Sequence, residues 1–266
     1  MKKILIPVCI ILLMLIQACG SSKETNSTTH ASTEKYDSRY LSATADGKMD
    51  EWGDKLSYDN SSKCIYSIAN DSSALYIAIK VLDRTQQMKM VQGGMEIWID
   101  SKAKKTKSTG VKFPVGGSAV TMPVSRNNNN PDPKEMRQQT RAQMLTMELT
   151  GFKEGLNGSQ SVYSDIPVKP VADWDKDNLV YELVIPFSAL NDNIAANLNN
   201  ISIGIFINGV KLPESGGMPG GGMPVGGPPG GMRPLGGGGS MPDRTQMNTI
   251  AKDDFFWTKY TIAKTK

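Results

Sequence analysis

The sequence predicts an all-β protein, a sandwich of two packed antiparallel β-sheets. Short segments in which apolar and polar residues alternate recur along the chain, divided by Asp, Asn and Gly. At least seven such segments are present, and the interleaved helices that a parallel sheet requires are missing. A chain of 266 residues with 39% hydrophobic residues is long enough to bury the core of one such domain.

Each strand is predicted from its own alternation. In the segment 74–82, Leu75, Ile77 and Ile79 share one face, while Tyr76 and Lys80 lie on the other. The other segments repeat this period of two, so each is expected to turn one face toward the core. The predicted strands are residues 64–69, 74–82, 95–100, 111–113, 179–185, 201–207 and 256–262.

The first 18 residues predict an export signal. Lys2 and Lys3 precede an apolar run, residues 4–16, which has the length of the hydrophobic region of a secretory peptide and is too short to span a membrane. The residues that follow, Ile16-Gln17-Ala18-Cys19, resemble the lipobox of bacterial lipoproteins, in which the cysteine is diacylated before cleavage. The resemblance implies that Cys19 becomes the lipidated first residue and attaches the protein to a membrane.

Residues 19–42 are expected to be a tether. The stretch 20–35 is rich in Ser and Thr and has no large apolar residue that could enter a core. No Asp directly follows Cys19, so the lipoprotein resemblance gives no sign of retention at the inner membrane. We therefore expect the outer membrane, with the protein on its periplasmic or cell-surface face.

The composition argues against several kinds of chemistry. The one histidine, His30, lies in the tether, which argues against a multi-histidine zinc site, histidine-ligated haem and a Ser-His-Asp triad. Without residues 1–18 the chain has 28 basic residues, 30 less Lys2 and Lys3, against 26 acidic ones. This near balance, with no basic cluster beyond residues 102–107, argues against nucleic-acid binding. Only Cys64 would remain as a thiol, so no intrachain disulfide is expected.

Two insertions are predicted within the sandwich, which is expected to span residues 43–266. The first, about 115–160, holds the best helix candidate, beginning at Pro133, whose last residues fit a strand equally well. The second, 213–242, has thirteen Gly, seven Pro and four Met in thirty residues and predicts a disordered low-complexity loop. Its methionines are too loosely spaced to identify a copper site.

Several motifs outside the tether and insertions resemble the family 9 carbohydrate-binding modules and the related DOMON-like sandwiches. These motifs are DGKMDEW at 46–52, a Tyr66-bearing strand that ends in AND at 69–71, ALYIA at 74–78, EIWID at 96–100, YELVIP at 181–186 and the closing strand 257–262. The resemblance implies a β-sandwich with a sugar or haem site at one end and, in some members, a structural calcium ion. Because haem-bearing members use an ordered histidine, the position of His30 favours a sugar and no cofactor.

Trp174 is the strongest candidate for a ligand platform. Sugar binding needs an aromatic ring for the apolar face of the sugar and carboxylates or amides for its hydroxyls. Trp174 lies in a polar stretch, residues 171–177, that predicts a loop, with Asp173 and Asp175 beside it. The alternative, which is the more common position for tryptophan, is a ring folded back over the edge of the sandwich. The other tryptophans, Trp52, Trp98 and Trp257, are expected to cover the sheets.

The sequence leaves open whether the protein binds a metal ion. Asp46, Asp50 and Glu51 offer the carboxylate oxygens that calcium prefers, but the Asp46-Gly47 pair also predicts a plain turn into the first strand. We prefer the turn, because no EF-hand spacing is present.

Together these observations predict a membrane-anchored exported lipoprotein whose non-catalytic β-sandwich binds a glycan or a similar extracellular ligand. The alternative is an envelope structural or assembly lipoprotein whose segment 213–242 contacts a protein partner, which crosslinking in cells before and after deletion of that segment would distinguish. An enzyme is not expected, because Asp173 and Asp175 are too close in sequence to indicate the acid/base pair of a glycosidase.

Overall fold

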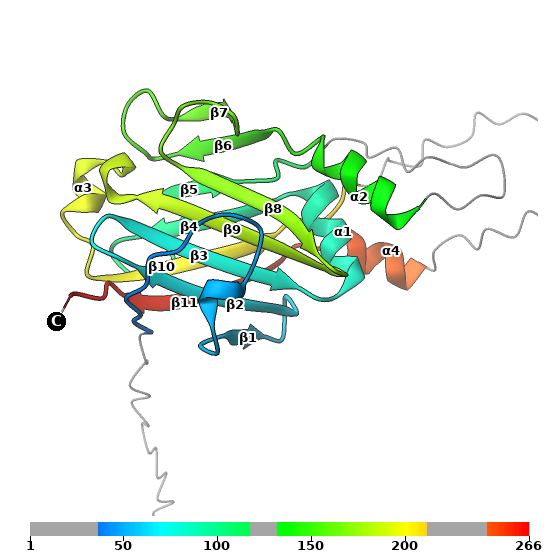
Figure 1. The fold of residues 1–266 in the computed structure, drawn as a ribbon, viewed down its shortest axis with the longest axis horizontal. Coiled ribbons are helices and arrows are strands. Elements are labelled where there is room, and N and C mark those ends of the chain that lie inside the picture. Colours follow the sequence, from blue (N-terminus) through cyan, green and yellow to red (C-terminus); the bar gives the residue numbers. More distant parts are fainter. Residues whose placement is uncertain (1–36, 118–131, 212–243, 266) are drawn as a thin grey trace, which may run out of the picture. The chain divides into compact units, whose positions relative to one another are not determined.

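The computed structural model describes residues 37–117, 132–211 and 244–265, which form two antiparallel β-sheets packed face to face (Figure 1). One sheet has five strands in the order β1-β2-β3-β9-β8, and the other has six in the order β11-β10-β4-β5-β6-β7. The all-β sandwich predicted from the alternating segments is confirmed. The predicted signal peptide, Cys19, His30 and the loop 213–242 lie outside the described residues.

All seven predicted strands are present, together with four shorter or more polar strands. The strands are β1 (Ser57–Asp59), β2 (Cys64–Asn70), β3 (Ala74–Val81), β4 (Met95–Asp100), β5 (Thr109–Lys112), β6 (Thr146–Thr150), β7 (Gly158–Ser161), β8 (Lys169–Asp175), β9 (Asn178–Pro186), β10 (Asn200–Ile207) and β11 (Asp254–Thr261). The helices are α1 (Arg84–Gly93), α2 (Pro133–Arg141), α3 (Asp192–Ala195) and α4 (Arg244–Ala251), with 3-10 helices at Asp50–Trp52 and Phe187–Ala189. Among the described residues, no helix combines the length and the apolar character that crossing a membrane requires.

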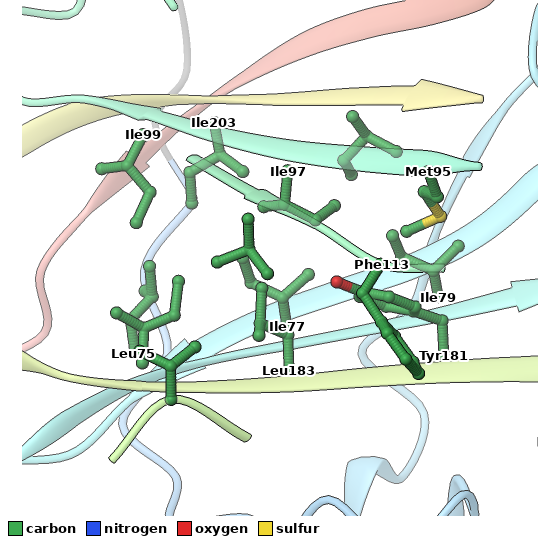
Figure 2. Close-up of a cluster of buried hydrophobic side chains, with 14 of the residues drawn as sticks. Leu75, Ile77, Ile79, Met95, Ile97, Ile99, Phe113, Tyr181, Leu183 and Ile203 are labelled. Carbon is green, nitrogen blue, oxygen red and sulfur yellow. The ribbon is translucent and has the colours of Figure 1, made fainter. Parts of the chain in front are cut away.

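The core lies between the two sheets and is built from the inward-facing set of alternating residues. Figure 2 shows Ile77 of β3 and Leu183 of β9 on one side of this core, facing Ile97 of β4 and Ile203 of β10 on the other. Each of these side chains is at most 1% exposed. Burial of one such side chain contributes about 1.5–3 kcal/mol relative to its exposure, so this layer is the main source of stability.

The N-terminal segment 37–53 covers the outer face of the five-stranded sheet. Its Trp52 packs with Tyr76 and the alanines of β2 and β3 in a second, smaller apolar cluster. Residues 37–42, expected as the end of the tether, already contact the sandwich, because Asp37 pairs with Tyr260 and Tyr40 pairs with Asn70 through the backbone. Backbone pairing of this kind requires no particular pattern of side chains, so it cannot be predicted from the sequence.

The segment 115–160, expected as an insertion, contributes two strands to the six-stranded sheet where it is described. Its helix α2 begins at Pro133 as predicted, and the Asp132 side chain caps it by accepting from the Lys134 N–H. The chain then continues as β6, which pairs with β5, and β7, which pairs with β6. The residues at the end of the helix candidate therefore form a strand, the second of the two possibilities.

Candidate ligand-binding site

The structure places Trp174 on the edge strand β8 rather than in a loop. Its indole is partly buried and packs against the main core, as does Ala172 two residues earlier. The indole Nε1 lies 3.4 Å from Gln87 Oε1 and donates to it. The predicted loop is wrong, because β8 continues to Asp175 and pairs with β9 up to that residue. An edge strand with acidic residues on its outward face has the same composition as a loop.

The side chains of Asp173 and Asp175 do not lie beside the Trp174 ring. They alternate with Trp174 along β8, so their side chains lie on the opposite face of the strand. Asp173 is ion-paired with Arg141 of α2, and Asp175 Oδ2 lies 3.4 Å from Lys80 Nζ. The three residues are therefore not brought together into one site, and their role in ligand binding stays a prediction.

A different group of aromatic side chains lies on the outer face of the six-stranded sheet. Trp98 of β4, Phe206 of β10, and Phe255 and Trp257 of β11 alternate with the core-facing residues of their strands, so they point away from the core. Phe255 is 54% exposed, and the other three are partly exposed. We call these four residues the aromatic face.

Two glycines allow the indole rings to lie against the sheet. Gly110 of β5 pairs with Trp98, and a Cβ atom at Gly110 would lie 2.4 Å from a carbon of the Trp98 ring. Gly204 of β10 pairs with Trp257, and a Cβ there would lie 2.9 Å from the Trp257 ring. Each indole thus occupies the space above a glycine.

The rings of the aromatic face also contact one another. Phe206 and Phe255 are stacked, with ring centroids 5.0 Å apart and planes 9° apart. Trp257 meets Phe206 edge-on, at 5.8 Å and 86°. Both arrangements are favourable for aromatic quadrupoles, so the rings hold one another in place before any ligand arrives.

Charged and polar groups lie directly beside these rings. Glu96 Oε2 accepts from Trp98 Nε1 and from Lys107 Nζ, both at 2.8 Å, and Glu96 Oε1 accepts from Asn208 Nδ2 at 3.2 Å. Lys107 Nζ also lies 3.9 Å from the Phe206 ring centroid, a cation–π distance. Burial acts to raise the pKa of Glu96, but the hydrogen bonds from Lys107 and Trp98 outweigh it, so the pKa lies below its usual value.

An open depression of about 970 Å³ adjoins the aromatic face. Glu96 and Asn208 belong to its lining, together with Gln92, Lys112 and Asp253. The same sheet face therefore carries aromatic rings, hydrogen-bonding side chains and a concave region in one continuous area, which is the combination that ligand sites typically show.

The structure also brings together three carboxylates, Asp46, Glu51 and Glu182, with oxygens within 4.8 Å of one another. Asp50, which the sequence groups with Asp46 and Glu51, is not one of them. Glu182 is 2% exposed. Its Oε2 accepts from the backbone N–H groups of Asp46 and Gly47 at 2.9 and 2.7 Å.

These carboxylates already accept hydrogen bonds from within the protein. Glu182 Oε1 accepts from Trp52 Nε1 at 2.8 Å, and Glu51 Oε1 accepts from the Thr44 N–H at 3.0 Å. N–H donors therefore already point at these oxygens, whereas calcium takes six to eight oxygen ligands. The group instead joins the N-terminal segment to β9, and Gly47, with φ of 81°, forms the turn that the Asp-Gly pair predicts.

The sequence places Trp98 and Trp257 on strands, where they were expected to cover the sheet, and they do lie against it. What the sequence does not show is that they share one outer face with Phe206 and Phe255. The useful signal is a glycine in the middle of a predicted strand, such as Gly204, because it indicates the close approach of a neighbouring group.

No protein-family model and no curated protein matches the chain. Among solved structures, a family 9 carbohydrate-binding module from Caldicellulosiruptor kristjanssonii in complex with glucose is similar, with a TM-score of 0.35 and 13% identity over 65% of this chain and 77% of that chain. A second structure of such a module from the same organism, in complex with cellotriose, has a TM-score of 0.33 and 14% identity over 65% of this chain and 75% of that chain. Similarity at this level supports no inference about a ligand, and the fold assignment rests on the sheet topology.

Proposed function

We propose that this chain is an exported lipoprotein whose sandwich is a non-catalytic glycan-binding module, with the aromatic face as its binding surface. The observation that carries the proposal is the set of four outward-facing rings beside Glu96, Lys107 and Asn208. A sugar has apolar C–H faces that stack on rings and hydroxyls that pair with charged and amide groups. Both kinds of partner lie side by side here, because Glu96 accepts hydrogen bonds from Trp98 and from Lys107.

The charge state of Glu96 suits a hydrogen-bond acceptor rather than a general acid. A glycosidase needs a carboxylic acid whose pKa is raised, so that it carries a proton to the leaving group. The pKa of Glu96 is lowered, despite the opposing effect of burial, because Lys107 and Trp98 donate to its carboxylate. Glu96 is thus an ionised hydrogen-bond acceptor at neutral pH.

The dimensions of the aromatic face fit a short oligosaccharide. The face extends over β4, β10 and β11, which are neighbours in the sheet, so it is about 10 Å wide at roughly 4.8 Å per strand. The adjoining depression lengthens it along β4. A ligand of several linked sugar rings would bury more of these side chains than a single sugar.

Affinity-gel electrophoresis of the full chain on a panel of soluble polysaccharides tests the proposal. We expect at least one polysaccharide to retard wild type, and Phe255→Ala or Trp257→Ala to weaken that binding about tenfold, since a stacked aromatic contributes on the order of 1 kcal/mol beyond its buried area. Tyr58→Ala is the matched control, because Tyr58 of β1 is also 54% exposed and lies on the other sheet.

Two results would contradict the assignment. If no polysaccharide retards the wild type, the module is not a glycan binder, and the protein-partner alternative is favoured. If only Trp174→Ala weakens retardation, the ligand lies at Trp174, the platform predicted from the sequence, and not on the aromatic face.

The membrane anchor is part of the same proposal and has its own test. The lipobox-like residues before Cys19 support diacylation, and two or more acyl chains give the stable attachment that one chain does not. We expect Cys19→Ser to move the protein from the membrane fraction to the soluble fraction, and the wild type to partition with the outer membrane. Retention of the Cys19→Ser protein in the membrane fraction would refute lipidation as the anchor.

A further inference from the structure

The loop between β4 and β5, residues 101–108, carries four lysines and no acidic residue. We call it the lysine loop. All four lysines are exposed. In the part of the chain that the structure describes, Lys107 pairs with Glu96, but no salt bridge involves Lys102, Lys104 or Lys105. Three exposed lysine side chains thus have no salt-bridge partner among the described residues.

The backbone of the lysine loop is held in a fixed conformation. Asp100, 3% exposed, accepts from three of its N–H groups: those of Lys102 at 2.8 Å, and of Lys104 and Thr106 at 2.9 Å each. Ser202 Oγ of β10 accepts a further N–H, from Lys105 at 3.2 Å. With these donors turned inward, the loop is ordered in advance, so a ligand need not pay the entropy of ordering it.

Lys107 connects the lysine loop to the aromatic face. Its Nζ lies above the Phe206 ring at 3.9 Å and near the Trp98 ring at 5.3 Å, while it donates to Glu96. The other three lysines belong to the same loop, which leaves β4 at the end opposite the depression. Lys107 is thus the one lysine of this loop whose side chain contacts the rings in the described part of the chain.

We propose that the lysine loop and the aromatic face together select an acidic polysaccharide, one whose sugar rings carry carboxylate or sulfate groups. The inference rests on the proposed glycan-binding function and names its substrate class. Stacking on Phe255 and Trp257 would hold the sugar rings, and Lys102, Lys104 and Lys105 would pair with the anionic groups. A neutral glycan would use the rings alone.

The geometry favours a polysaccharide over an anionic lipid surface. Aromatic side chains that enter a bilayer project from the protein, whereas the indoles of Trp98 and Trp257 lie against the sheet above Gly110 and Gly204. The ionised Glu96 among the rings would also be driven into the headgroup region, at a desolvation cost.

Isothermal titration calorimetry of the full chain tests the inference with two soluble polymers of one backbone, neutral hydroxyethylcellulose and anionic carboxymethylcellulose. The key variant is K102Q/K104Q/K105Q, which removes the three unpaired charges and keeps Lys107. The control is K55Q/K134Q/K176Q, which removes the same charge from exposed lysines outside the lysine loop.

We expect carboxymethylcellulose to bind the wild type more tightly than hydroxyethylcellulose, with an affinity that falls as salt increases. Because one exposed ion pair is weak, the three together should account for about a tenfold difference in Kd at low salt. The loop variant should lose this difference and keep its affinity for hydroxyethylcellulose, while the control variant should resemble the wild type.

Each contrary result has a distinct meaning. If both polymers bind and the loop variant resembles the wild type, the inference is refuted while the glycan-binding function stands. If neither polymer nor any other polysaccharide binds, both fail. If the wild type binds vesicles with anionic headgroups through Lys102, Lys104 and Lys105 but no acidic polysaccharide, the lysine loop serves the membrane and the inference is wrong.

Discussion

Removing the Asp100 carboxylate should release the lysine loop and lower the stability of the whole sandwich. Asp100 is almost fully buried at the end of β4 and accepts three backbone N–H groups, those of Lys102, Lys104 and Thr106. Asp100→Ala leaves all three donors without an acceptor. Asp100→Asn retains one oxygen, and if that oxygen takes the place of Oδ2, it keeps the two donors that Oδ2 serves.

The expected magnitude follows from these three bonds. A hydrogen bond to a charged group contributes about 1.5–3 kcal/mol, so three would sum to about 4.5–9 kcal/mol if they were independent and fully buried. The N–H groups belong to an exposed loop, and water can reach them after the substitution. We therefore expect a loss of about 3 kcal/mol for Asp100→Ala and about half of that for Asp100→Asn.

The pH dependence provides a second, independent measurement. Burial acts to raise the pKa of Asp100, but the backbone hydrogen bonds outweigh it and the pKa lies below its usual value of 3.8. A carboxylate with a lowered folded-state pKa stabilises the fold above its unfolded pKa, and this contribution is lost as the pH falls through the folded value. The difference between wild type and Asp100→Ala should thus be full at neutral pH and shrink in acid.

Urea unfolding followed by tryptophan fluorescence measures these differences, with the midpoint and slope reported at neutral and acidic pH. Asp83→Ala is the control for loss of a carboxylate that accepts a backbone N–H outside the lysine loop, because Asp83 caps α1 by accepting from the Gln86 N–H. A free energy of unfolding for Asp100→Ala within 0.5 kcal/mol of the wild type, a margin typical of surface substitutions, would refute the reasoning. Unchanged binding of acidic polysaccharide by Asp100→Ala would show that the loop conformation is irrelevant to it.

Three further predictions concern buried polar groups and are checked by the same unfolding measurements. Lys89 is fully buried with its Nζ 2.5 Å from Asp254, so Asp254→Ala should cost about 3 kcal/mol or more, and adding Lys89→Met should restore most of it. Tyr181→Phe should stabilise the protein by about 1 kcal/mol, because the fully buried Tyr181 hydroxyl has no hydrogen-bond partner among the residues that the structure describes; a clear loss of stability would contradict this. Burial raises the pKa of Glu182, although the three N–H groups that donate to its carboxylate act to lower it. The stabilisation that Glu182 contributes is therefore present in acid and lost as the pH rises through the folded pKa. The stability of Glu182→Gln relative to the wild type should therefore improve with increasing pH, and no change would contradict the raised pKa.

The sequence predicts the buried strands well because burial leaves a regular pattern. In β3 and β10, every second residue is a large aliphatic side chain, and both strands appear within one or two residues of their predicted bounds. The strands that the prediction misses are short or polar, such as β7, which is Gly158-Ser159-Gln160-Ser161 and has little apolar surface to bury. The edge strand β8 is misjudged as a loop for a similar reason.

The candidate site could not be predicted in the same way, because it depends on which strands are neighbours. Trp98 and Trp257 are 159 positions apart, and only the strand order β11-β10-β4 brings them onto one face. The same order places Gly204 between them. By contrast, the grouping of Trp174 with Asp173 and Asp175 relied on closeness along the chain, which a β-strand converts into opposite faces.

The backbone pairing of the first described residues determines how this molecule would carry mechanical load. The Asp37 N–H donates to the Lys259 carbonyl and the Asp37 carbonyl accepts from Thr261, both on β11, while the Arg39 carbonyl and the Leu41 N–H pair with Asn70 of β2. The segment is thus fastened to a strand of each sheet, and it runs parallel to β11 where they pair. Under the proposed anchoring, tension between the membrane and a bound polysaccharide would act along these strands as shear and would strain several bonds at once. A module attached in this way can resist being pulled open one bond at a time.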